Sequence, residues 1–235
     1  MRKLIIGMLV LTLSGCVEIE TAPRETPAPR TVSAPPRVSQ NRAARNFLAV
    51  VQRVEPIAER ECRKRTSRAN CDFKIVVDDR KGKAPNAYQT LDRSGRPVIA
   101  FTSALIAEAR NQDELAFIMG HEAAHHIKGH IPKTRQSATT GAVMGGLLAA
   151  VLGAGDAGIQ QAQRLGGAVG ARTYSKDFEL EADQLGTVIT ARSGYNPIKG
   201  AAFFNRIPDP GDRFLGSHPP NAQRMAIVRR TVANM

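Results

Sequence analysis

The chain has 235 residues, 42% of them hydrophobic and 5% aromatic, which suits one domain with a real core and a tail. Its formal net charge is +12, from 33 lysines and arginines against 21 aspartates and glutamates. Such a charge suits nucleic acid, but no recognition motif or aromatic platform accompanies it, so we expect no nucleic-acid partner. The charge favours contact with an anionic membrane surface, with a merely soluble basic surface as an equal alternative.

The first residues have the pattern of an export signal rather than of a folded element. Arg2 and Lys3 precede an apolar run over 4–13, which is too short to span a bilayer permanently. The run ends in the letters LSGC, which resemble a bacterial lipoprotein signal. We therefore expect residues 1–15 to be a signal peptide and Cys16 to carry the lipid. An ordinary cleaved signal with a coincidental cysteine is the alternative.

A proline-rich tether is predicted next. Residues 16–40 hold five prolines among small and polar residues, so they cannot bury a core and should be disordered. The folded domain is expected to cover residues 41–235. Val17 is not an acidic retention residue, so the expected location is the periplasmic face of the outer membrane, with the chain held there by its lipid.

The folded part is predicted to begin with a helix over residues 41–66, whose apolar residues form a broad stripe. Pro56 lies inside this helix and is a candidate kink. An exported chain meets an oxidising compartment, and lipidation of Cys16 leaves only Cys62 and Cys71. We expect these two cysteines to form a disulfide.

Two strands and a short helix are expected next. Residues 73–77 and 96–101 read as β-strands with turn residues between them. The second strand directly precedes the helices that carry the candidate site. It is either an open sheet edge, to which an extended peptide can pair, or an ordinary interior strand. Thr102 or Ser103 is placed to cap a short helix over residues 104–110.

The central element is a predicted helix over residues 113–130, with the letters DELAFIMGHEAAHHIKGH. His121 and His125 are one turn apart on one face, so their imidazoles can converge on a single small ion. Glu122 points about 100° further round the helix, beside the ion rather than onto it. This is the layout of a hydrolytic zinc site, in which two nitrogens hold the metal and a carboxylate takes a proton from water.

The ends of this helix are also marked. Asn111, followed three residues later by Glu114, resembles an N-terminal capping box. Gly129 and Pro132 supply a stop signal.

A glycine-rich stretch follows over residues 137–171. Its apolar part is about fifteen residues long, short of the roughly twenty that a spanning helix needs. We expect two mobile helices that form a flap near the site or the membrane. A buried helical hairpin and a transmembrane segment are the alternatives.

A catalytic zinc site needs a third protein ligand, and the letters FELEAD at 178–183 offer one. Glu179 and Asp183 are four residues apart on one helix face, while Glu181 faces away. We expect Glu179 to bind the metal and Asp183 to accept the outer N–H of a ligand histidine. His126 and His130 lie off the ligand face and are not expected to bind the metal.

Three stretches together resemble the HtpX- and BepA-like zinc metallopeptidases, which are relatives of the CAAX prenyl endopeptidases. They are HEAAHH at 121–126, FELEAD at 178–183 and SHPPNAQRM at 217–225. The resemblance implies an α+β, predominantly helical fold of the gluzincin type, with a small sheet beside the HExxH helix. No transmembrane helices like those of the membrane-embedded relatives are evident, so we expect a lipid-anchored member that does not process prenylated proteins.

The same resemblance implies a role for each site residue. His121, His125 and Glu179 would bind one Zn²⁺ per chain, Glu122 would be the general base, and Asp183 would support a ligand from behind. His218 would contribute to catalysis by a hydrogen bond to the oxyanion, or would hold the enzyme inactive on the open metal position. A structural histidine is the alternative. Arg224 would pair with Asp183 or anchor the loop.

The expected function is therefore that of a zinc-dependent endopeptidase acting on unfolded or misassembled cell-envelope proteins. Main-chain pairing to a sheet edge would select extended segments. The alternative is a chaperone or assembly factor for outer-membrane proteins, in contact with the outer-membrane assembly machinery, with a zinc site that is latched or rarely used. A hydrolase of cell-wall peptides is a third option.

Overall fold

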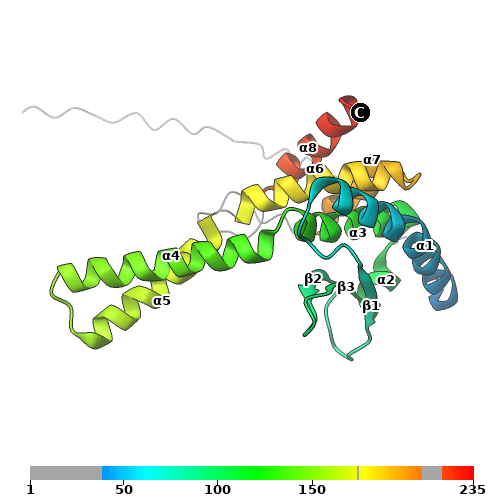
Figure 1. The fold of residues 1–235 in the computed structure, drawn as a ribbon. Helices are drawn as coiled ribbons and strands as arrows, with labels where there is room; N and C mark the ends of the chain where they lie inside the picture. The colour runs from blue at the N-terminus through cyan, green and yellow to red at the C-terminus, as the bar shows by residue number, and fades with distance from the viewer. Residues whose placement is uncertain (1–38, 174, 208–218) are drawn as a thin grey trace, which may run out of the picture. The chain divides into compact units, whose positions relative to one another are not determined.

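The protein is described here by a computed structural model that covers residues 39–173, 175–207 and 219–235. The predicted signal peptide, Cys16, nearly all of the tether, and His218 lie outside these described residues. In chain order the elements are α1 (Gln40–Arg65), β1 (Lys74–Asp78), β2 (Ala87–Leu91), β3 (Pro97–Thr102), α2 (Ser103–Glu108), α3 (Gln112–Ile127), α4 (His130–Val151), α5 (Asp156–Thr173), α6 (Ser175–Arg192), α7 (Pro197–Ala201), the 3-10 helix η1 (Ala202–Asn205) and α8 (Asn221–Ala233). The fold is predominantly helical with one small sheet, as predicted (Figure 1).

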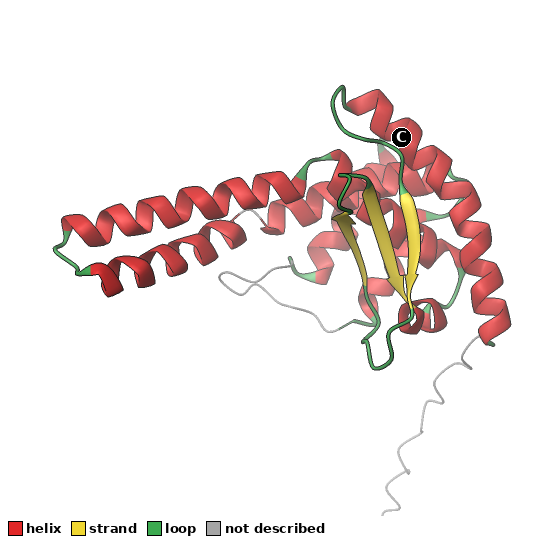
Figure 2. Cartoon of the chain, turned by 60° about the horizontal axis from the view of Figure 1, so that its bottom comes forward, coloured by secondary structure: helices red, strands yellow, loops and turns green. Residues whose placement is uncertain are grey.

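The sheet has three strands in the order β1-β3-β2 (Figure 2). β3 pairs in parallel with β1, with Ile75 opposite Ile99, and antiparallel with β2, with Tyr88 opposite Ala100. β2 was not among the predicted strands, because its sequence AYQTL is partly exposed along its length and has no run of apolar residues. Of the two alternatives for the second predicted strand, the interior strand is confirmed and the open edge was wrong: that strand is β3, which lies in the middle, and β2 lies at the edge.

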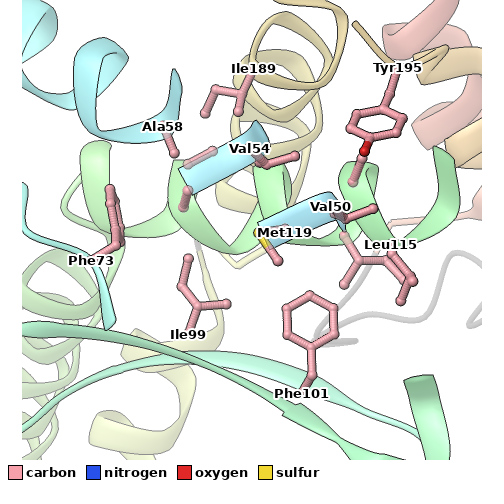
Figure 3. Close-up of a cluster of buried hydrophobic side chains, with 14 of the residues drawn as sticks. Val50, Val54, Ala58, Phe73, Ile99, Phe101, Leu115, Met119, Ile189 and Tyr195 are labelled. Carbon is pink, nitrogen blue, oxygen red and sulfur yellow. The ribbon is translucent and has the colours of Figure 1, made fainter. Parts of the chain in front are cut away.

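The main core lies between α1, α3 and the sheet (Figure 3). Val50, Val54 and Ala58 recur every four residues along α1, which places them on one face, and all three are buried. They meet Met119 of α3, while Ile99 of β3 closes the cluster from the sheet side. α1 runs through Pro56 as one helix. The pattern of apolar residues therefore fixes the face by which α1 covers α3.

The central helix α3 is shorter than predicted. Its first turn is capped as expected, since Asn111 Oδ1 accepts the N–H of Glu114 at 2.9 Å, but Glu114 Oε2 accepts the N–H of Arg110 instead of completing the box. The prediction of one helix to residue 130 was wrong, because Gly129 adopts the left-handed conformation with φ 66° and ends it. Pro132 does not act as a stop: it lies in the first turn of α4, where its missing N–H costs little.

The glycine-rich stretch forms the two helices α4 and α5, which lie side by side in Figures 1 and 2. Their contact is made by glycines: a Cβ on Gly141 would overlap the carbonyl of Gly166, and one on Gly170 would overlap that of Ser137. The alternative of a buried hairpin does not hold, because large apolar side chains along it are exposed. Among the described residues, no helix is long and apolar enough to cross a membrane.

Cys62 and Cys71 form a disulfide, the pairing expected from the sequence, with their Cα atoms 5.6 Å apart. The bond joins the last turn of α1 to the segment that leads into β1. It thereby fixes the end of α1 to the chain that enters the sheet.

Candidate metal centre

Three ligand atoms from two helices converge in the structure. His121 and His125 lie one turn apart on α3, with their Nε2 atoms 3.0 Å from each other. Glu179 of α6 places Oε2 3.5 Å from His121 Nε2 and Oε1 3.3 Å from His125 Nε2. Ligands at zinc bonding distances in a tetrahedron are about 3.3 Å apart. The three side chains therefore match the donor types and the spacing of one small divalent ion.

Two glycines let the helices approach closely enough for this. A Cβ on Gly120 of α3 would come within 2.9 Å of the carbonyl oxygen of Gly186 on α6. A Cβ on Gly186 would come within 2.9 Å of the backbone nitrogen of His121. The helices therefore cross in backbone contact at the residue beside the first histidine. As a result Glu179, two turns before Gly186, and Asp183, one turn before it, face that histidine.

His121 is held from behind by a buried carboxylate. Its Nδ1 lies 2.9 Å from Asp183 Oδ1, which leaves Nε2 for a metal. Arg224 of α8 donates to both oxygens of Asp183, from Nε and Nη2, each at 2.7 Å. The guanidinium of Arg224 in turn lies over the ring of Phe204, 3.7 Å from its centroid. Asp183 has no exposed surface, so this doubly bonded arginine is what makes its charge tolerable.

The charges around His121 favour a cation. Burial lowers the pKa of His121, but hydrogen bonds and attraction to Asp183 and Glu179 outweigh it and raise the pKa to about 10. Without a metal, the imidazole therefore keeps a second proton near neutral pH. Two buried carboxylates thus hold a positive charge at this position, as a metal-binding site must.

His125 has a partner that the sequence analysis did not assign. Its Nδ1 lies 2.8 Å from Nδ1 of His130, the first residue of α4. His130 stacks on Phe178 with ring centroids 4.5 Å apart, and its Nε2 lies 3.5 Å from Oε2 of Glu181. Burial, together with the charge of His125, lowers the pKa of His130 to about 4, so it is neutral and can accept the proton of His125 Nδ1. The break at Gly129 is what turns His130 back toward His125.

A cleft of about 860 Å³ opens over these side chains, and Glu122 lines it beside His121 and His125. One wall is the segment Pro85–Gln89, which includes the start of β2. Apolar side chains contribute much of the remainder: Leu105, Phe117, Ile118, Phe203, Phe204 and Ile207.

Most of the residues singled out by the sequence meet here. His121, Glu122, His125, Glu179 and Arg224 line the cleft, and Asp183 lies directly behind it. His218 lies outside the described residues, so the structure does not test its predicted role. The remaining histidine of the motif, His126, points elsewhere, with Nε2 donating to the carbonyl of Asn70 at 2.7 Å. The sequence gave no sign of that contact, whereas the His-x₄-His spacing from His125 to His130 could have drawn attention to His130.

Comparison with known proteins gives one family. The model of peptidase family M48 matches residues 47–232 of the chain. The chain is 32% identical over 129 residues to the putative beta-barrel assembly-enhancing protease of Vibrio cholerae serotype O1, covering 52% of this chain and 26% of that protein. It is 25% identical over 150 residues to the beta-barrel assembly-enhancing protease of Escherichia coli K12, covering 58% of this chain and 31% of that protein. The matched region is thus about a quarter to a third of the length of these curated relatives.

Proposed function

Because the chain belongs to peptidase family M48, we propose that it is a zinc-dependent endopeptidase, with His121, His125 and Glu179 as the ligands of one Zn²⁺. The observation that carries the proposal is the convergence of their donor atoms within 3.0–3.5 Å of one another in a cleft. Zinc bound there would supply a Lewis acid and lower the pKa of a water ligand. Asp183 would fix His121 in the tautomer that offers Nε2 outward.

Glu122 is the proposed general base. It lines the cleft next to the three ligand side chains without belonging to the set of mutually close ligand atoms. Its carboxylate would take a proton from the attacking water and pass it to the nitrogen of the leaving amine. Arg224 holds the carboxylate of Asp183 in place with two hydrogen bonds, so that His121 would keep its orientation while the peptide bond is broken.

The cleft supports an extended peptide as the substrate. β2 pairs with β3 along one side only, and the described residues place no strand on its other side. Because Ala87, Tyr88 and Gln89 of this edge strand also line the cleft, an extended main chain could add to the sheet within reach of the ligands. Folded proteins do not expose such segments, so the substrates we propose are unfolded or misassembled proteins.

The cell envelope is the proposed location. We propose residues 1–15 as a lipoprotein signal, Cys16 as the lipidated residue, 16–40 as a tether and 41–235 as the peptidase domain. The relatives are named for assembly of β-barrel proteins, which supports envelope proteins as substrates and the periplasmic face of the outer membrane as the site of action. His218 remains a proposed contributor to catalysis.

The test is the variant Glu122→Gln in the full chain, measured by casein digestion and by metal analysis. We expect cleavage to fall by about 10²- to 10⁴-fold, because the amide cannot accept a proton, while the zinc content stays at that of the wild type. Asp156→Asn removes an exposed carboxylate in the first turn of α5 and should leave both quantities unchanged. Retained proteolysis in Glu122→Gln would reject Glu122 as the base.

A second function is favoured by the names of the relatives, which join a protease to β-barrel assembly. The chain would then act mainly as an assembly factor for outer-membrane proteins. Complementation of a deletion strain separates the two. Rescue by Glu122→Gln equal to that by the wild type would support the assembly role, and failure to rescue would support proteolysis.

A further inference from the structure

The hairpin of α4 and α5 has its large apolar side chains on the outside. Soluble helical hairpins bury leucine and methionine between the helices, but here glycines fill that interface and leave no room for larger residues. The side chains that a solvated hairpin would hide are therefore exposed, with Leu148 62%, Val151 83% and Leu152 76% accessible. Other members of the exposed set are Val143, Met144, Leu147, Leu165 and Val169.

Four of these side chains line one flank of the hairpin. A groove of about 800 Å³ lies along this flank. It is lined by Leu148 of α4, by Leu152 directly after the end of α4, and by Leu165 and Val169 of α5. Met144 lies one turn before Leu148 and extends the same line. The flank thus draws on both helices and is continuous along the hairpin.

Two of the four lysines and arginines between residues 130 and 173 line up with this flank, while Arg135 and Arg164 lie off it. Lys133 lies eleven residues before Met144, and Arg172 lies seven residues after Leu165, so each is within about 20° of the apolar line on its own helix. Both are exposed. The acidic Asp156 lies nine residues before Leu165, about half a turn away and on the other side of α5. The flank therefore combines an uncharged apolar surface with two cations at the end nearest the cleft.

We propose that this flank binds the surface of an anionic phospholipid bilayer. The apolar side chains would enter the boundary between headgroups and acyl chains, and Lys133 and Arg172 would contact lipid phosphates. The hairpin would lie on the surface, since neither helix is long and apolar enough to span a bilayer. A second copy of the chain fits the flank less well, because a two-fold contact of this flank with itself offers the two cations no acidic partner.

The position of the hairpin gives the contact a consequence for the cleft. His130, Ile131 and Thr134 of the first turns of α4 line the cleft, and Lys133 lies among them. A hairpin held on lipid would therefore hold the cleft beside the membrane. The lipid contact is independent of the proposed proteolysis and of any lipid on Cys16.

The test places an environment-sensitive fluorophore at one position of the hairpin in the full chain. Cys16→Ser removes the free thiol, and Cys62 and Cys71 are bonded to each other, so that Leu148→Cys provides the labelled residue. Gln160→Cys is the matched control, because Gln160 is exposed on α5 and lies one turn from Asp156 on the side away from the flank. Vesicles of phosphatidylcholine with phosphatidylglycerol are compared with vesicles of phosphatidylcholine alone.

We expect a blue shift, and quenching by doxyl-labelled lipid, at position 148 but not at position 160, and only with the anionic vesicles. Lys133→Gln and Arg172→Gln should each lower the vesicle partition coefficient measured at position 148 about fivefold. No lipid-dependent shift at position 148, or an equal shift at both positions, would overturn the proposal. So would a shift that appears without lipid and grows with protein concentration, because it would assign the flank to a second copy of the chain.

Discussion

At the scale of single residues, the two histidines of the motif are held in different ways. His121 Nδ1 meets the buried carboxylate of Asp183, whereas His125 Nδ1 meets the neutral imidazole of His130. Both arrangements leave Nε2 directed toward Glu179. An outer hydrogen bond of this kind fixes the tautomer and the ring orientation of a ligand histidine. His130 should therefore affect metal affinity although it is not a ligand.

We predict that His130→Phe weakens zinc binding about 10- to 100-fold, because phenylalanine keeps the stacking on Phe178 but cannot accept a proton from His125. His130→Asn offers an oxygen close to the position of Nδ1 and should retain more of the affinity. Competition with a chromophoric chelator measures the affinity, and circular dichroism checks the fold. Equal zinc affinity in the wild type and both variants would show that His130 only fills space.

At the scale of elements, the crossing of α3 and α6 determines the site. The Gly120–Gly186 contact brings the two backbones together without side chains between them. Thr190 Oγ1 contributes a 2.7 Å bond to the carbonyl of Gly186 on the same face. α8 also packs against α6, and its Arg224 donates hydrogen bonds to Asp183. Any change that parts α3 from α6 should therefore separate Glu179 from the two histidines.

We predict that Gly186→Ala destabilises the protein by about 1–3 kcal/mol, because the new methyl group would meet the backbone of His121. The same displacement should weaken zinc binding. Gly155→Ala is the control, since nothing lies within 4 Å of a Cβ there and its backbone is not left-handed. Urea unfolding and zinc titration of both variants provide the measurements. An unchanged midpoint and zinc affinity in Gly186→Ala would contradict the role given to this crossing.

At the scale of the whole molecule, several contacts join α1 to the helices that form the site. The disulfide fixes the end of α1 to the loop before β1, and the carbonyl of Asn70 in that loop accepts a hydrogen bond from His126 of α3. Arg192 at the end of α6 forms an ion pair with the buried Glu61 of α1. The helix that covers the core is thus linked to both helices that carry the ligands.

We predict that replacing both cysteines, Cys62→Ser with Cys71→Ser, lowers the stability by about 2–3 kcal/mol, the loop entropy that a bond closing about ten residues removes from the unfolded chain. The melting temperature should fall by roughly 5–10 °C. Reductant should lower the melting temperature of the wild type and leave that of the double variant unchanged. If reductant leaves the melting temperature of the wild type unchanged, the disulfide has no stabilising role.

The sequence by itself determined which side chains share a helix face at the candidate site, and most of the main helices. Spacing of four residues places His121 and His125 on one face, and Glu179 and Asp183 on another, whatever the rest of the chain does, because the α-helix fixes these directions locally. The same local rules gave α1, the capped start of α3 by Asn111 and the small content of strands.

Only the tertiary structure decided how these faces meet. β2 was missed because its half-exposed residues form a strand only when β3 is there to pair with them. The partners of His125 and His126 were not predicted. The turn at Gly129 brings His130 to His125, and the loop closed by the disulfide brings the carbonyl of Asn70 to His126. The outward flank of α4 and α5 likewise follows from glycine contacts between two helices. The periodicity of a helix or strand can be seen in neighbouring residues of the sequence. Contacts between elements depend on packing between residues that are far apart in the sequence.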